Sequence, residues 1–106
     1  MTNWIDVDAE QAIAPGEYRV VETDDGDILI VNDDGTFHAI EDRCSHQDLA
    51  LSGGPVADGT ITCPWHGAEF CLRSGAALSA PAYEDIHRFP VRVENGIVQV
   101  QDDRFD

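Results

Sequence analysis

The chain has 106 residues, of which 42% are hydrophobic and 25% are charged. This length suits one small domain, and this composition is typical of a folded chain rather than a disordered one. Six basic side chains stand against 21 acidic ones, so the formal net charge is −15. Such a charge repels phosphate backbones and anionic lipids, which argues against nucleic acid and membrane surfaces as partners and favours a partner with a basic docking patch.

Turn signals recur at short intervals and divide the chain into short runs that predict β-strands. One helical turn is expected over residues 8–14, and Asn95-Gly96 between two strand-like runs predicts a tight hairpin. Many short strands with frequent turns predict an all-β fold, an antiparallel sandwich or small barrel. The expected strands cover residues 18–22, 27–31, 36–40, 60–62, 69–72, 89–93 and 97–101.

Residues 42–81 interrupt this pattern. They hold all three cysteines and many of the glycines, and they carry few charges. An irregular segment within a regular β domain is a common location for a functional site. We therefore expect a single domain over residues 1–106, with an inserted, site-bearing subdomain at about 42–81.

The cysteines also bear on the compartment. Their number is odd, which favours metal binding or catalysis over disulfides. The sequence lacks a run of ~20 apolar residues, and its start lacks the basic and apolar regions of a signal peptide. These features predict a cytoplasmic protein.

Two short motifs in the insertion carry candidate metal ligands, namely Cys44-Ser45-His46 and Cys63-Pro64-Trp65-His66. Sulfur and nitrogen ligands suit zinc or an iron–sulfur cluster and poorly suit magnesium or calcium. Structural zinc loops separate paired ligands by about two to four residues, so the one-residue gap in the first motif is tight for a single ion. The gap suits two metal atoms, with the cysteines on one and the histidines on the other.

With these motifs the sequence resembles the soluble Rieske-type [2Fe–2S] ferredoxins, which serve bacterial aromatic-ring-hydroxylating dioxygenases. The resemblance also includes Leu51-Ser52-x-Gly54 between the motifs and two residues behind them, Phe70 and Gly75. It implies an electron carrier without catalytic residues of its own, a flavoprotein ferredoxin reductase as electron donor and a terminal oxygenase as acceptor.

The resemblance also implies the ligands of one [2Fe–2S] cluster. Cys44 and Cys63 would bind one iron, and His46 and His66 would bind the other. Cys71 is then left over, and we expect it to be a small buried residue on a strand.

The resemblance further predicts a low reduction potential. High-potential Rieske proteins add a cysteine to each motif and place hydroxyl donors near the cluster. The matching positions here are Leu49 and Trp65 for the cysteines, and Ala68 and Phe70 for the hydroxyls. In the high-potential proteins the two added cysteines form a disulfide, which Leu49 and Trp65 cannot form. Ala68 and Phe70 cannot donate hydrogen bonds to sulfur, so the potential is expected near the bottom of the Rieske range.

Other functions stay open at this point. A Rieske ferredoxin of a diiron monooxygenase, the small subunit of an assimilatory nitrite reductase and a zinc-stapled interaction domain share parts of the pattern. A terminal oxygenase is excluded by length, because its mononuclear iron needs further ligands and only His38 and His87 are left as histidines.

Overall fold

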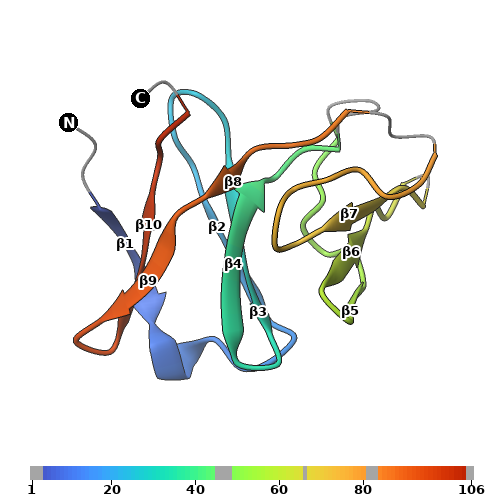
Figure 1. Ribbon diagram of the computed structural model, residues 1–106. Helices are drawn as coiled ribbons and strands as arrows, with labels where there is room; N and C mark the ends of the chain where they lie inside the picture. The colour runs from blue at the N-terminus through green and yellow to red at the C-terminus, as the bar shows by residue number, and fades with distance from the viewer. Residues whose placement is uncertain (1–3, 45–48, 66, 81–83, 105–106) are drawn as a thin grey trace.

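The computed structural model describes residues 4–44, 49–65, 67–80 and 84–104. Within these residues, ten β-strands form three antiparallel sheets and there is no α-helix (Figure 1). The first sheet consists of β1 (Trp4–Ala9), β10 (Ile97–Gln101) and β9 (Val91–Glu94). The central sheet consists of β2 (Tyr18–Val21), β3 (Ile28–Asp33), β4 (Thr36–Glu41) and β8 (Arg88–Phe89). The third consists of β5 (Val56–Ala57), β6 (Thr60–Thr62) and β7 (Glu69–Cys71).

The predicted all-β antiparallel fold is confirmed, with three corrections to its strands. The run predicted over 89–93 is divided at Pro90 into β8 and β9, which lie in different sheets, because proline has no N–H to donate to a ladder. Two strands were not predicted from the sequence, namely β5, which is too short for a pattern, and β1, whose register shifts between Asp6 and Asp8. The expected helical turn is the 3₁₀ turn Glu10–Ala12.

The predicted Asn95-Gly96 hairpin connects β9 to β10. Both turn residues have positive φ, 53° at Asn95 and 77° at Gly96. Asp34 and Gly35 connect β3 to β4 in the same way, with φ of 53° and 94°. Asparagine, aspartate and glycine tolerate this left-handed conformation, which explains why these dipeptides mark the two turns.

The core has two parts, one on each face of β3. Along this strand Ile28 and Ile30 point into one cluster, and Leu29 and Val31 point into the other. Successive side chains of a strand point to opposite faces, so a strand that is apolar throughout is covered on both sides. The first cluster also contains Val98 and Val100 of β10, so the first and central sheets pack face to face as a sandwich.

The third sheet belongs to a subdomain that covers the other face of the central sheet (Figure 1). It is inserted between β4 and β8, which are neighbouring antiparallel strands. The returning chain is fixed where the Ile86 N–H donates to the Gly75 carbonyl at 2.9 Å. The predicted insertion is therefore confirmed, and its two ends emerge side by side from the central sheet. Within the described residues, no helix is long and apolar enough to cross a membrane.

Candidate metal centre

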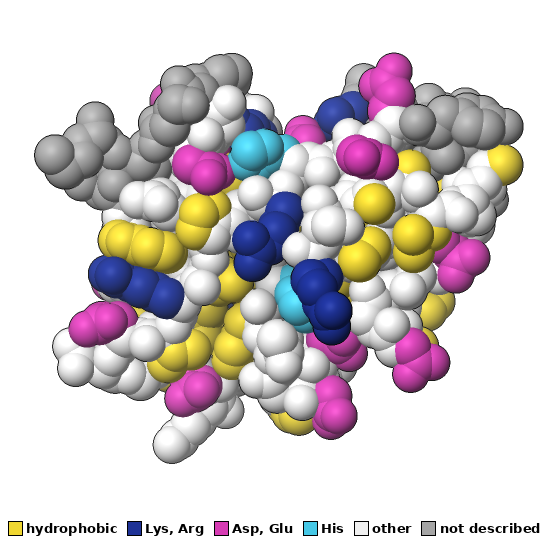
Figure 2. All heavy atoms as spheres, viewed as in Figure 1, with side chains coloured by type: hydrophobic (Ala, Val, Ile, Leu, Met, Phe, Trp, Pro, Cys, Tyr) yellow, Lys and Arg dark blue, Asp and Glu magenta, His cyan; other side chains and the backbone are white. Residues whose placement is uncertain are grey.

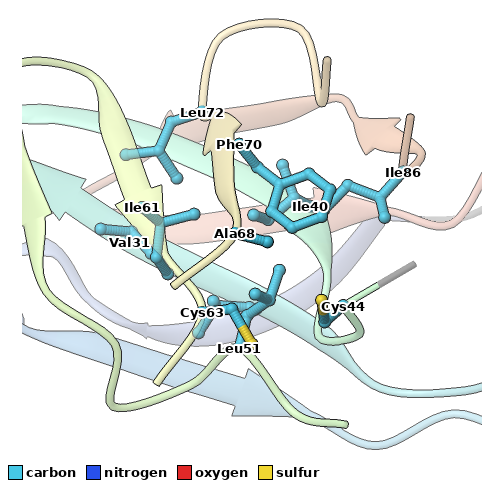
Figure 3. Close-up of a cluster of buried hydrophobic side chains, with 11 residues drawn as sticks. Val31, Ile40, Cys44, Leu51, Ile61, Cys63, Ala68, Phe70, Leu72 and Ile86 are labelled. Carbon is cyan, nitrogen blue, oxygen red and sulfur yellow. The ribbon is translucent and has the colours of Figure 1, made fainter. Parts of the chain in front are cut away.

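The two motif cysteines lie in the core between the central sheet and the subdomain. Cys44 follows β4 and is 1% exposed, and Cys63 follows β6 and is 2% exposed. Figure 3 shows both at one end of the same buried cluster, next to Leu51. Residues 19 positions apart in the sequence thus place two sulfur atoms in one region of the fold.

Each cysteine begins a short loop that is closed in the same way. The Cys44 N–H donates to the Leu49 carbonyl at 2.7 Å, and the Cys63 N–H donates to the Ala68 carbonyl at 2.7 Å. In both cases the bond joins residue i to residue i+5. The predicted ligands His46 and His66 belong to these two loops but lie outside the described residues, so their assignment as ligands stays a prediction.

Residues 50–55 bridge the two loops, and we call them the bridge segment. The Trp65 indole N–H donates to the Ala50 carbonyl at 3.3 Å, and the Thr62 N–H donates to the Pro55 carbonyl at 3.0 Å. The bridge segment therefore contacts the second loop on both sides of Cys63.

Gly54 packs tightly against the chain on both sides of Cys63. A Cβ built on Gly54 would lie 2.1 Å from the Thr62 carbonyl oxygen, 3.0 Å from the Leu51 carbonyl oxygen and 3.2 Å from Cδ of Pro64. Only glycine fits between these atoms without moving the backbone.

The side chains around the two cysteines are apolar. Ala68, Phe70 and Leu51 are each 0% exposed and belong to the same cluster as the sulfur atoms (Figure 3). Ala68 and Phe70, which lack hydroxyl groups, thus both face the core that contains the cysteine sulfurs. Neither side chain can donate a hydrogen bond to cluster sulfur, and fewer such bonds favour a lower potential.

The prediction that Cys71 is buried is wrong, because its side chain is partly exposed. Phe70 points into the core, and the two-residue period of β7 therefore turns Cys71 outward. It lines an open groove of about 720 Å³ together with His38 and Arg73. A hydrogen bond with the Ser74 side chain holds the pKa of the Cys71 thiol below its usual value.

One contact near the cysteines gave no signal in the sequence. The Ser52 N–H donates to Oδ1 of Asp42 at 2.7 Å, joining the bridge segment to the bend just before Cys44. The two residues are ten positions apart and belong to no common local pattern, so only the fold reveals their contact. Over the described ranges as a whole, no three His, Cys, Asp or Glu residues are grouped so that they could hold a metal ion.

A β-sandwich with an inserted subdomain, in which two closed loops each present a buried cysteine, defines a class of small β domains that can hold a metal centre through loop cysteines. Cysteine thiolates at the edge of an apolar core suit iron–sulfur coordination. Comparisons with known proteins identify the family. Residues 3–90 match the model of the Rieske [2Fe-2S] domain, and the chain belongs to this family.

Similar proteins agree with this assignment. The 3-phenylpropionate/cinnamic acid dioxygenase ferredoxin subunit of Photorhabdus laumondii is 43% identical over 75 residues, which are 70% of this chain and 71% of that protein. Apoptosis-inducing factor 3 of Homo sapiens is 37% identical over 86 residues, 81% of this chain, but the match spans only 14% of that longer protein.

A solved structure shares the fold. One chain of a complex of reduced oxygenase and oxidized ferredoxin in carbazole 1,9a-dioxygenase superposes with a TM-score of 0.87 and 32% identity, covering 92% of this chain and 91% of that chain. The resemblance to Rieske ferredoxins is thereby confirmed. The cofactor of the domain is a [2Fe–2S] cluster rather than zinc.

Proposed function

We propose that this chain carries single electrons from a flavoprotein ferredoxin reductase to the terminal oxygenase of an aromatic-ring-hydroxylating dioxygenase. The observation that carries the proposal is the pair of equivalently closed loops, each with a buried cysteine at its start. Support comes from the ferredoxin subunit that is 43% identical and from the oxygenase–ferredoxin complex that shares the fold.

The proposed ligands are Cys44 and Cys63 on one iron and His46 and His66 on the other. When bound, the cluster supplies reversible one-electron chemistry, and imidazole ligation raises its potential above that of an all-cysteine cluster. The chain's own contribution is to hold the two thiolates in an apolar core and the two loops at a fixed separation. Four protein ligands complete the coordination, so the centre has no position for a substrate and we assign no catalytic residue.

The surface charge fits a carrier that meets its partners by diffusion. On the face shown in Figure 2 the acidic side chains are dispersed rather than gathered in one patch. With a net charge of −15, the whole molecule attracts a basic docking surface, and this effect mainly raises the association rate. Electron transfer to either partner should therefore slow as ionic strength rises.

The domain and compartment are proposed on the same basis. Residues 1–106 act as one Rieske domain with the centre at about 42–81, because the return of the chain beside β4 closes the insertion on the sandwich. A cytoplasmic location suits cysteines that serve as ligands rather than as disulfide partners.

The ligand set is tested with one histidine variant and one matched control. His46→Cys replaces a neutral imidazole with a thiolate, which lowers the potential toward the ~−400 mV of all-cysteine clusters or causes loss of the cluster. His38→Cys is the control, because His38 lies on β4 and is not a proposed ligand. An unchanged potential and EPR spectrum in His46→Cys would remove His46 from the ligand set.

The partners are tested with the purified wild-type chain. We expect a reduction potential near the bottom of the Rieske range, and a value above about +100 mV would contradict the low-potential assignment. Reconstitution with a reductase and oxygenase from the same genome should give substrate-dependent oxygen uptake only when the chain is present. Support of a diiron hydroxylase or a nitrite reductase instead would replace the proposed partner with one of those alternatives.

A further inference from the structure

Asp42 lies in the bend between the end of β4 and Cys44, and it is held from two sides. Its backbone N–H donates to the Asp27 carbonyl at 3.0 Å, which fixes the bend to the segment before β3. Its side-chain Oδ1 accepts the N–H of Ser52 at 2.7 Å, in a partly buried location. A hydrogen bond to a carboxylate is shorter and stronger than a neutral one.

Ser52 occupies the middle of a tight turn in the bridge segment. The Gly54 N–H donates to the Leu51 carbonyl at 3.0 Å, which closes the turn around Ser52. Leu51 is 0% exposed in the cluster that contains both motif cysteines, and Gly54 packs against Thr62 and Pro64 beside Cys63. A restraint on Ser52 is thus a restraint on the position of both loops.

The hydrogen bonds from Trp65 to Ala50 and from Thr62 to Pro55 do not provide this restraint. They connect the bridge segment only to the second loop, and neither bond involves the chain that precedes Cys44. The Asp42 carboxylate instead joins the bridge segment to the chain that precedes Cys44. It therefore links the start of the first loop to the segment that packs against the second.

We propose that Asp42 is a positioning residue of the metal centre. Its carboxylate fixes the turn at 51–54 and thereby sets the first cysteine loop relative to the second. This inference rests on the proposed function, since the loops are positioned for a shared cluster. Its predicted effect on the bridge segment, however, is measurable without reference to iron.

The test compares Asp42→Ala, which removes the acceptor, with Asp42→Asn, which keeps an oxygen acceptor but removes the charge. Asp24→Ala is the control, because Asp24 is an exposed carboxylate in the turn after β2. The proteins as isolated are studied by hydrogen exchange with mass spectrometry, followed in a peptide that covers residues 50–55. The rate of bleaching of the visible absorption in air gives the retention of the cluster.

In Asp42→Ala we expect exchange in the 50–55 peptide to rise about tenfold and bleaching to accelerate about fivefold, since one amide loses its charged acceptor. Asp42→Asn should stay within about twofold of the wild type in both rates, and Asp24→Ala should match the wild type. Exchange in a peptide over β9 and β10 should not change in any variant.

Three results would overturn the proposal. The first is an exchange rate or a bleaching rate in Asp42→Ala that equals the wild-type rate. The second is an effect of Asp42→Asn as large as that of Asp42→Ala. The third is a rise of exchange in β9 and β10 of Asp42→Ala as large as that in the 50–55 peptide, which would indicate global destabilisation. If Asp42→Ala does not fold, a folded Asp42→Asn with wild-type retention supports the proposal, and failure of both variants overturns it. A colourless wild-type protein would refute the proposed function, whereas the exchange result would still decide the role of Asp42.

Discussion

Gly54→Ala is the substitution that most directly tests the contact between the two cysteine loops. The added Cβ would lie 2.1 Å from the Thr62 carbonyl oxygen, in the peptide unit that leads into Cys63. Because this neighbour is backbone, no side-chain rotation can relieve the overlap. The bridge segment and the second loop must separate by about 1 Å to restore ordinary contact distances.

The cost follows from the kind of atom that is displaced. Overpacking a well-packed region costs about 1–3 kcal/mol. Gly54 has no positive φ to add a conformational penalty, so its entire cost is steric. With carbonyl oxygens of Leu51 and Thr62 on two sides, we expect the upper end, about 3 kcal/mol. For a domain of this size that corresponds to a fall in Tm of roughly 12–24 °C.

The assay is thermal unfolding by circular dichroism, recorded together with the visible absorption of the cluster. Gly35→Ala is the control, because Gly35 has φ of 94° but a Cβ added there would meet no atom within 4 Å. It should cost about 1–2 kcal/mol from the left-handed backbone alone and leave cluster retention unchanged. A Gly54→Ala protein as stable as wild type, or less destabilised than Gly35→Ala, would refute the reasoning.

Three further predictions concern the framework around the site. Arg104→Ala should destabilise the fold by about 3 kcal/mol, because the Arg104 guanidinium donates five hydrogen bonds and the side chain is only 10% exposed. The control Arg92→Ala removes an exposed side chain and should cost about 0.5–1 kcal/mol. Denaturant unfolding measures both costs. Phe70→Ala should cost about 3–5 kcal/mol in the same assay, because the ring is 0% exposed between the sheets. Burial lowers the pKa of His38 below 6.5, so just below that pH only the unfolded chain gains a proton at this residue. The free energy of unfolding should therefore fall as pH decreases from 6.5 toward the folded-state pKa. His38→Gln should remove this component when urea unfolding is compared between about pH 8 and pH 5.

Each of these predictions has a contradicting result. Equal costs for the two arginine variants would show that the hydrogen bonds of Arg104 contribute no more than surface contacts. A loss below about 1 kcal/mol in Phe70→Ala would show that the core between the central sheet and the subdomain can collapse around the cavity. An unchanged pH dependence in His38→Gln would assign the acid sensitivity to other groups.

The chemistry of the site was predictable because it is encoded locally. Cys44 and His46, and likewise Cys63 and His66, are close enough in sequence for one loop to carry both. Residue type and spacing therefore predicted them as candidate metal ligands without any knowledge of the fold. Strands β3 and β4 of the central sheet were predictable for a similar reason, since the Asp34-Gly35 turn and the apolar run before it are local signals.

Contacts across the fold were not predictable in this way. The exposure of Cys71 depends on the facing of β7 against the core, and the register of a short strand is set by its neighbours. Pro90 was visible in the sequence as a residue that interrupts a strand. That the chain passes there from one sheet to another depends on which strands lie alongside β8 and β9.

The sequence by itself indicated the family and, through that resemblance, the [2Fe–2S] cofactor, because the two cysteine-histidine motifs place candidate ligand atoms at short spacing. The tertiary structure alone decided how the two loops are held relative to each other, through Gly54 packed against the second loop and Asp42 bonded to Ser52. The physical reason is that close packing and hydrogen bonds between distant segments depend on the positions of whole sheets, and no short stretch of sequence specifies those positions.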